Sequence, residues 1–250
     1  MPSIKEASLA EILSLREHFL KENPFQIRYH ACHERGWSDS YLIQMGEKPI
    51  GYSSVKGKEE LSDRDAIFEF YLLPEFQKFS SDIFSELLKE TKVVYIESQS
   101  NEPLLTSCLY EFGKNIYADV ILFEDGKPTD FSFPHLTFRK RNPGENVFGK
   151  LERDAGAYVL EEAGEIIADG GFLTHYNLPF ADLYMEVRED RRKQGYGSFI
   201  LQEIKKLCYQ EGRVPAARCN LANKASQATL KKAGMKICGF MLTGEVHANT

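Results

Sequence analysis

The 250-residue sequence lacks the signals that mark secreted and membrane-spanning proteins. Its five cysteines are an odd number and include no C-x-x-C pair, which disfavours a disulfide scaffold and favours reduced thiols. No run approaches the roughly 20 apolar residues of a membrane span. No apolar segment follows the charged residues near the start, so we expect no secretory signal and a cytoplasmic location.

Several common classes of site are also missing. The segment His30-Ala31-Cys32-His33 has no second ligand pair at zinc spacing, so we expect no metal site. The chain has no Walker loop, G-x-x-x-x-G-K-[ST], and no dinucleotide fingerprint, G-x-G-x-x-G, followed by an acidic residue. A net charge of −6 argues against nucleic acid as the main partner.

One short segment carries the strongest positive signal. Residues 192–197, Arg-Lys-Gln-Gly-Tyr-Gly, follow an apolar strand-like run at 183–187 and precede an amphipathic helix-like run at 197–210. A strand that turns through glycines into a helix points backbone N–H groups and the positive end of the helix dipole outward. Because Gly195 and Gly197 lack Cβ, an anion can approach the backbone closely. The segment predicts a phosphate or pyrophosphate site, although alone it would match many helix-capping turns.

A second motif follows the first in the sequence. After the helix-like run comes a strand candidate at 216–219, then Asn223, then a second helix-like run. Lys231 and Lys232 followed by Gly234 form a helix stop signal, and a last strand candidate covers 237–242.

Together the two motifs resemble the Gcn5-related N-acetyltransferase (GNAT) superfamily over residues 158–242. The resemblance implies that the first motif binds the pyrophosphate of acetyl-CoA as co-substrate, without a metal. The second motif, Asn223 through a helix to Gly234-Met235, strengthens the match. The residues expected at the cofactor are Val187, Arg192, Lys193, Gln194, Gly195, Tyr196, Gly197 and Asn223.

The same pattern occurs twice in the chain. Each half has a predicted hairpin, with turns at Gly46 and Gly164, 118 positions apart. Leu72 matches Val187 at an offset of 115. We therefore expect an α/β (α+β) protein of two tandem acetyltransferase-like domains, each a mixed, mostly antiparallel sheet flanked by helices. The expected boundaries are 1–125 for a degenerate domain and 126–250 for the acetyl-CoA-binding domain.

Each copy departs from the pattern at a different place. In the first copy Ser80 and Asp82 stand where Gly195 and Gly197 stand in the second. A carboxylate there would repel a pyrophosphate, so we expect Asp82 to cap a helix at 83–90 and the first domain to bind no CoA. The second copy lacks the amphipathic helix that Ser8-Leu9-Ala10-Glu11, a capping box, begins in the first. This loss is expected to leave the acceptor side open, or covered by the other domain.

The strand at 182–187 carries the candidate catalytic groups. Its alternation puts Asp182, Tyr184 and Glu186 on one face, where a buried sheet would be apolar. Glu186 is the candidate base that takes a proton from an attacking amine. The resemblance implies that the backbone near Val187 binds the acetyl carbonyl. The family's usual tyrosine acid is replaced here by Leu230, so we consider Tyr184, or water, as the proton donor.

The function these observations predict is an acyl-CoA-dependent N-acyltransferase that moves acetyl from acetyl-CoA to an amine of a small molecule or peptide. The tandem arrangement resembles that of mycothiol synthase. Two alternatives stay open: a non-catalytic acyl-CoA-binding regulatory module, which the residue at Leu230 favours, and an aminoacyl-tRNA-dependent transferase, which the acidic charge disfavours. The sequence does not fix the oligomeric state, the acceptor or the acyl chain length.

Overall fold

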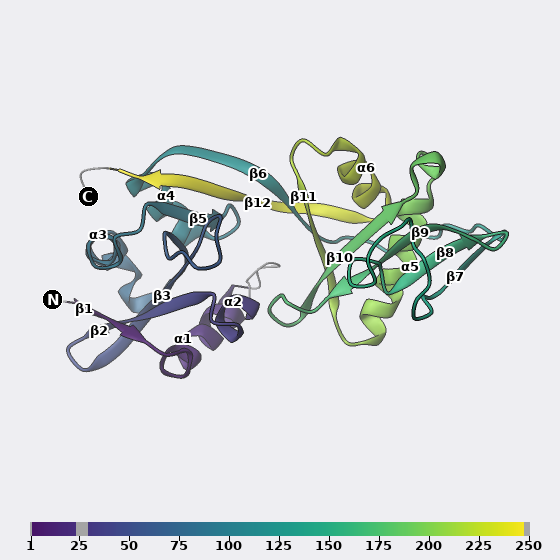
Figure 1. Cartoon of the computed structure of the whole chain (residues 1–250). Coiled ribbons are helices and arrows are strands. Elements are labelled where there is room, and N and C mark those ends of the chain that lie inside the picture. Colours follow the sequence, from purple (N-terminus) through teal and green to yellow (C-terminus); the bar gives the residue numbers. More distant parts are fainter. Residues whose placement is uncertain (1, 24–29, 248–250) are drawn as a thin grey trace. The chain divides into compact units, whose positions relative to one another are not determined.

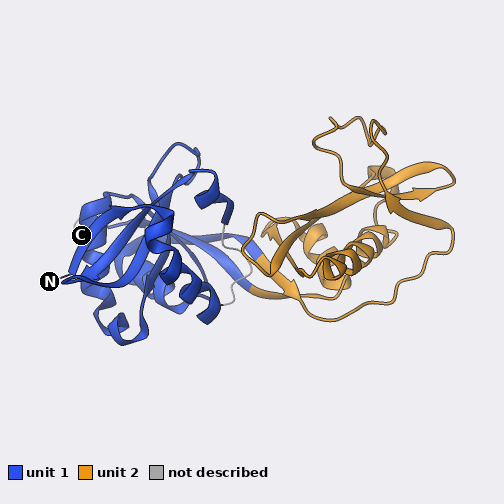
Figure 2. Cartoon of the chain, turned by 90° about the horizontal axis from the view of Figure 1, so that it is seen from below, with its two compact units in different colours: residues 1–121, 239–250 blue, residues 122–238 orange. Residues whose placement is uncertain are grey.

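A computed structural model describes residues 2–23 and 30–247 (Figure 1). The chain forms two compact units, shown in Figure 2. Unit 1 comprises residues 1–121 and 239–250, and unit 2 comprises residues 122–238. The units differ from the expected ranges 1–125 and 126–250 because two long strands, β6 (Gly113–Asp125) and β12 (Met235–Val246), each run from one unit into the other.

Unit 1 begins with a strand and a capped helix. As predicted, Ser8 caps the first helix: the Glu11 N–H donates to Ser8 Oγ, and the Ser8 N–H donates to Glu11 Oε2 at 2.8 Å. The elements of unit 1 before β6 are β1 (Pro2–Ala7), α1 (Leu9–Glu22), α2 (His30–Glu34), β2 (Ser38–Met45), β3 (Lys48–Lys56), β4 (Ala66–Leu72), the 3-10 helix η1 (Pro74–Phe79), α3 (Ser80–Thr91), β5 (Tyr95–Gln99) and α4 (Pro103–Phe112).

The sheet of unit 1 buries both of its faces. Its strands follow the order β1-β2-β3-β4-β5-β12, and all neighbouring pairs are antiparallel except β4 with β5. Neighbouring residues on β2 point to opposite sides: Leu42 packs with Ile12 and Phe19 of α1, whereas Ile43 belongs to the core under α3 and α4. This alternation explains why helices are needed on both sides of the sheet.

Unit 2 repeats the same succession of elements without the first helices. Its elements after β6 are β7 (Leu136–Lys140), β8 (Tyr158–Glu162), β9 (Glu165–Leu173), β10 (Phe180–Val187), the 3-10 helix η2 (Glu189–Arg191), α5 (Tyr196–Gln210), β11 (Val214–Asn220), α6 (Lys224–Lys232) and the start of β12. The strand order is β6-β11-β10-β9-β8-β7.

The topology confirms the predicted fold class and the internal repeat. Both predicted hairpins are present, β2–β3 with its turn at Gly46 and β8–β9 with its turn at Gly164. In both units a parallel pair follows, β4 with β5 and β10 with β11. The match of Leu72 to Val187 therefore joins the last residues of equivalent strands.

The degenerate loop of unit 1 differs from expectation in one detail. Helix α3 begins at Ser80, and Phe79 occupies its N-cap position without a side-chain hydrogen bond. Asp82 therefore does not cap a helix; it lies in the first helical turn, where its negative charge still interacts favourably with the dipole. The prediction was wrong because the η1 turn precedes α3 directly and leaves no extended residue for a cap.

Polar side chains form a buried network in unit 1. The Glu69 carboxylate of β4 has no exposed surface and accepts two hydrogen bonds from Arg16, at 3.1 Å each. It also contacts His33 Nε2 at 3.1 Å and accepts from the Tyr52 hydroxyl at 3.0 Å. His30, through Nδ1, contacts Arg16. Both histidines of the His30–His33 segment are thus engaged with this network.

Replacing Arg16 by Met should destabilise the protein by about 3–5 kcal/mol, because it leaves the buried Glu69 charge without its main partner. Burial alone would raise the pKa of Glu69, but Arg16 and His33 hold it well below the ordinary value. Ionised Glu69 therefore contributes stability above its unfolded-state pKa of about 4.3, and loses it as pH falls through the folded-state pKa.

Urea unfolding of wild type and Arg16→Met at pH 7 and pH 3.5 measures this contribution. The difference between the two proteins should shrink at the lower pH. A double variant, Arg16→Met with Glu69→Gln, is the control and should recover part of the stability at pH 7. An Arg16→Met protein as stable as wild type at pH 7 would contradict the assignment.

Candidate functional site

Strands β10 and β11 pair over only three residues and then separate. Phe180, Ala181 and Asp182 of β10 face Val214, Pro215 and Ala216 of β11, and no further pair between them occurs among the described residues. On its other side β10 stays paired with β9 from Asp182 to Val187. The second half of β10 therefore has one free backbone edge.

The hydrogen bonds of β10 show which of its peptide groups point toward the free edge. The Arg188 N–H donates to the Ile167 carbonyl on the β9 side. Because backbone groups alternate in direction along an antiparallel strand, the peptide groups of Met185 and Val187 face the free edge. The Val187 carbonyl accepts there from Arg192 Nε at 3.1 Å, while its N–H remains directed at the same side.

The loop after β10 takes a left-handed turn twice before α5 begins. Lys193 has a φ of 64° and Gly195 a φ of 92°. Gly195 is the N-cap of α5, and no side chain caps this helix end. Turns of this kind, next to a helix N-terminus, direct several N–H groups to one point, which suits an anion.

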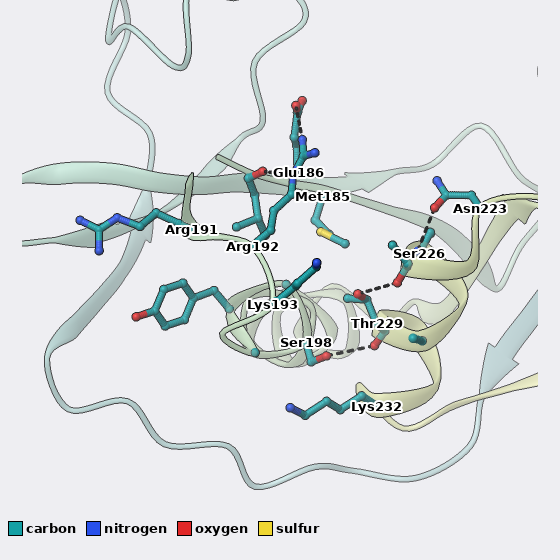
Figure 3. Close-up of a pocket in the computed structure, with 16 residues that line it drawn as sticks. Met185, Glu186, Arg191, Arg192, Lys193, Ser198, Asn223, Ser226, Thr229 and Lys232 are labelled. Atoms are coloured by element: carbon teal, nitrogen blue, oxygen red, sulfur yellow. Dashed lines mark hydrogen bonds and ion pairs between the residues drawn. The ribbon is translucent and has the colours of Figure 1, made fainter. Parts of the chain in front are cut away.

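A cavity of about 640 Å³ lies where the free edge, the loop and α6 meet (Figure 3). Met185, Glu186 and Val187 line it from β10. The loop and α5 contribute Arg191, Arg192, Lys193, Gly195, Tyr196, Gly197 and Ser198, and the α6 region contributes Asn223, Ala225, Ser226, Ala228, Thr229 and Lys232. The charged residues of this lining are four basic side chains and a single acidic one, Glu186.

Gly195 and Gly197 are required at their positions for two different structural reasons. Gly195 needs its left-handed backbone, which side-chain-bearing residues rarely adopt. Gly197 instead allows close packing, because an added Cβ would lie 3.0 Å from Thr229 Cγ2 and 3.3 Å from Met185 Cε. The sequence interpretation gave both glycines the same reason, an open approach for an anion.

Glu186 is held by a lysine that the sequence interpretation missed. Lys150 Nζ lies 2.9 Å from Glu186 Oε2 and 2.8 Å from Asp169 Oδ1. Asp169 is the residue opposite Glu186 on β9 and is only 1% exposed, whereas the Glu186 side chain is half exposed. Burial alone would lower the pKa of Lys150, but its contacts with the two carboxylates outweigh burial and raise it.

Lys150 comes from the irregular segment 141–157, which takes the place of the missing helices. Val147 of this segment is fully buried, and the Gly156 N–H donates to Asp169 Oδ2 at 2.6 Å. The side of β9 and β10 that carries Asp169 and Glu186 is therefore partly covered from within unit 2. The expectation that this side is open, or covered by the other domain, did not include a segment of unit 2 itself.

Tyr184 points away from the cavity. Its hydroxyl lies over Gly171, where an added Cβ would be 2.8 Å away, and Tyr184 is not part of the cavity lining. Burial raises the pKa of Tyr184, and a hydrogen bond from the Ala157 backbone partly opposes this rise. Gln194, another predicted cofactor residue, also lies outside the lining.

Helix α6 presents small hydroxyl residues to the cavity. Asn223 caps it by accepting the Ser226 N–H at 3.0 Å. Ser226 and Thr229, one turn apart, line the cavity, while Leu230 is 4% exposed and packs inward. Leu230 thus leaves the position of the usual tyrosine without any polar group.

The structure brings together eight of the ten predicted site residues: Glu186, Val187, Arg192, Lys193, Gly195, Tyr196, Gly197 and Asn223. Their binding and catalytic roles stay predictions. Lys150, Asp169 and Lys232 were missed as site residues. Only Asp169 had a signal in the sequence, since an acidic residue in an otherwise apolar strand pattern needs a partner.

Comparison with known proteins agrees with this geometry. A family model described as an acetyltransferase (GNAT) domain matches residues 8–126, and one described as the acetyltransferase (GNAT) family matches residues 121–235. No curated protein matches the sequence significantly. The chain therefore belongs to the GNAT superfamily of N-acetyltransferases and carries two GNAT domains in tandem.

Solved structures share the fold over the full length of the chain. A GNAT-family acetyltransferase from Colwellia psychrerythraea is 16% identical, with a TM-score of 0.76 and coverage of 98% of this chain and 100% of that one. A GCN5-related N-acetyltransferase from Sphaerobacter thermophilus is 13% identical, with a TM-score of 0.63 and coverage of 100% and 97%. A tandem GNAT protein from the clavulanic acid biosynthesis pathway is 8% identical, with a TM-score of 0.57 and full coverage of both chains.

Proposed function

We propose that unit 2 binds acetyl-CoA and transfers its acetyl group to an amine of a small molecule or peptide. The observation that carries this proposal is the free edge of β10 beside a cavity that is rich in basic side chains and lies at the uncapped N-terminus of α5. The pyrophosphate would lie on the loop of residues 192–197, next to these backbone N–H groups. The thioester arm would run along the free edge toward Glu186.

In the proposed reaction, the amine nitrogen attacks the thioester carbonyl carbon. A C–N bond forms, the C–S bond breaks and CoA leaves as a thiolate. The Val187 N–H is directed at the free edge and would stabilise the oxyanion. Glu186 would take the ammonium proton, directly or through water, because an alkylamine with a pKa of about 10.4 is protonated at neutral pH.

The proton donor, the role of unit 1 and the location of the protein are further parts of the proposal. Tyr184 points away from the cavity, so the thiolate would leave with a proton from water. Unit 1 would bind no acetyl-CoA, since Asp82 puts a negative charge in the first turn of α3, where it would repel the pyrophosphate. We also propose a cytoplasmic location, in which the five cysteines stay reduced. None of the described helices is long and apolar enough to cross a membrane.

Turnover of acetyl-CoA with a pool of small amines and lysine-containing peptides tests this function. Free CoA should appear in proportion to an acetylated amine identified by mass spectrometry. Binding of acetyl-CoA without any acetylated product would instead favour the non-catalytic regulatory module. Absence of binding would reject both.

A Lys150→Met variant should lose about tenfold in kcat, because Glu186 would lose the partner that orients it toward the acceptor. The variant should also be about 2 kcal/mol less stable, since the buried Asp169 would lose its lysine partner and, among the described residues, would keep the Gly156 N–H. The double variant Lys150→Met, Asp169→Asn removes both charges and is the control. Its stability should recover while its kcat stays low. Recovery of kcat together with stability would show that Lys150 acts only on folding.

A further inference from the structure

A strap of residues 126–135 follows β6 and crosses unit 2 beside α5. Its first residues are fixed to the end of α6: the N–H groups of Gly126 and Lys127 both donate to the Gly234 carbonyl, at 3.1 and 2.9 Å. At the left-handed Gly234 an added Cβ would lie 2.2 Å from the Lys127 carbonyl oxygen. The path of the strap is therefore set by close backbone contact with residues that follow α6.

Two buried polar side chains of α5 fix the middle of the strap. Gln202 accepts from the Phe131 N–H at 2.7 Å and donates to the Phe131 carbonyl at 3.0 Å, as a neighbouring strand would do. Lys205, one turn further along α5, donates to the Lys127 carbonyl at 3.0 Å. Both side chains are only 4% exposed, so their desolvation would be costly without these bonds.

The strap brings two aromatic rings to the open end of α5. Phe133 packs against Tyr196 and Phe199, with ring centroids 5.4 and 5.2 Å apart. Its Cζ atom and Lys232 Nζ both lie 3.4 Å from the Cβ position of Gly195. Phe131 is partly exposed, and Lys232 Nζ lies 5.6 Å from the centre of its ring.

Among the described residues, no carboxylate pairs with the charge of Lys232. Of the four basic residues that line the cavity, Arg191 pairs with Glu162, and Arg192 lies 3.9 Å from Glu186. Within the part of the chain that the structure describes, Lys193 and Lys232 have no carboxylate partner. Lys193 lies in the loop itself, whereas Lys232 lies on the last turn of α6, next to the strap.

We propose that the strap and Lys232 form the subsite for the nucleotide end of the acyl-CoA, with Lys232 pairing with the 3′-phosphate and Phe131 carrying the adenine ring. This subsite rests on the proposed function of unit 2. An acyl-CoA has three phosphates, and two of them, the pyrophosphate, would occupy the loop under the proposed function. The third needs a further cation, and Lys232 supplies one from α6, beside the loop and next to Phe131 of the strap. Base stacking on an aromatic ring needs no hydrogen-bond match and suits a partly exposed Phe.

Calorimetry of the full-length protein with acetyl-CoA and acetyl-3′-dephospho-CoA tests the phosphate contact. Wild type should bind the dephosphorylated compound about tenfold more weakly, as expected for loss of one charge-assisted contact. Lys232→Met should lose about tenfold for acetyl-CoA and nothing for acetyl-3′-dephospho-CoA. Lys231→Met, which removes the same charge from the neighbouring exposed position outside the cavity lining, should bind both compounds as wild type does.

Equal losses for both compounds in Lys232→Met would place Lys232 on the pyrophosphate and overturn the subsite. So would a wild type that binds both compounds equally well, although the proposed function would survive that result. If wild type binds neither compound, the proposed function and the subsite fall together.

Phe131 is tested by a change that keeps its apolar volume. Phe131→Leu should weaken binding of both compounds by about three- to tenfold, since both carry adenine. Phe131→Tyr retains the ring and should bind as wild type does. Thermal melting checks that the variants are folded. Unchanged affinity in Phe131→Leu would remove the adenine from this surface.

Discussion

A Gly197→Asp variant should lose at least about a hundredfold in affinity for acetyl-CoA, because it places a carboxylate at the first turn of α5, where the pyrophosphate is proposed to bind. Unit 1 already shows this arrangement, with Asp82 in the first turn of α3. The measurement is a calorimetric titration of the full-length protein. Wild type should bind one acetyl-CoA per chain, and the variant should show no residual event.

Steric effects have to be separated from charge at this position, because any Cβ at Gly197 meets Thr229 Cγ2 at 3.0 Å. Gly197→Ala brings the same methyl contact without the charge. It should cost about 1–3 kcal/mol of stability and retain most of the affinity. If Gly197→Ala loses binding as fully as Gly197→Asp, packing of α5 on α6, and not charge, governs the site. Unchanged affinity in Gly197→Asp would rule out the loop as the pyrophosphate site.

Glu186→Gln should lower kcat at pH 7 by about 10²–10⁴-fold, the usual effect of removing a general base. The rate should recover partly as pH rises toward the amine pKa of about 10.4, because more of the acceptor is then neutral. Affinity for acetyl-CoA should change little. A pH series of initial rates with a single amine, from pH 7 to 9.5, measures both effects.

Glu165→Gln is the matched control. Glu165 is an exposed residue of β9 that pairs with Arg188, outside the cavity lining. Its variant should keep the wild-type rate and pH profile. A Glu186→Gln enzyme with a normal rate at pH 7 would remove Glu186 as the base while leaving the acyl-CoA site intact.

The parts of the fold that local patterns determine could be predicted from the sequence. The Ser8 capping box, the two hairpins and the strand–loop–helix unit around Gly195 each depend on residues close together in the chain. Hydrophobic periodicity and turn residues specify such elements directly. The cavity residues that directly precede and follow the loop, Val187 and Gly197, could be predicted from this same strand–loop–helix unit.

The missed residues act across long distances in the sequence or lie in irregular structure. Lys150 belongs to the segment 141–157, which has no periodicity, and it contacts Asp169 and Glu186 on two different strands. Lys232 had the features of a helix stop signal, and nothing in the sequence separates it from Lys231. Only the turn of α6 places one lysine in the cavity lining and leaves the other outside it.

The path of strand β12 through both units affects how the protein can fold during its synthesis on the ribosome. The part of β12 that follows Cys238 belongs to unit 1, where β12 pairs with β5 through Met241–Glu245. Domains commonly fold during synthesis in the order in which they emerge, N-terminal first. In this protein the order differs. All residues of unit 2 have left the exit tunnel once Cys238 has emerged, whereas unit 1 still lacks its part of β12. A nascent chain that stalls before residue 239 would carry an unpaired edge on β5, so completion of unit 1 depends on the part of β12 that follows Cys238.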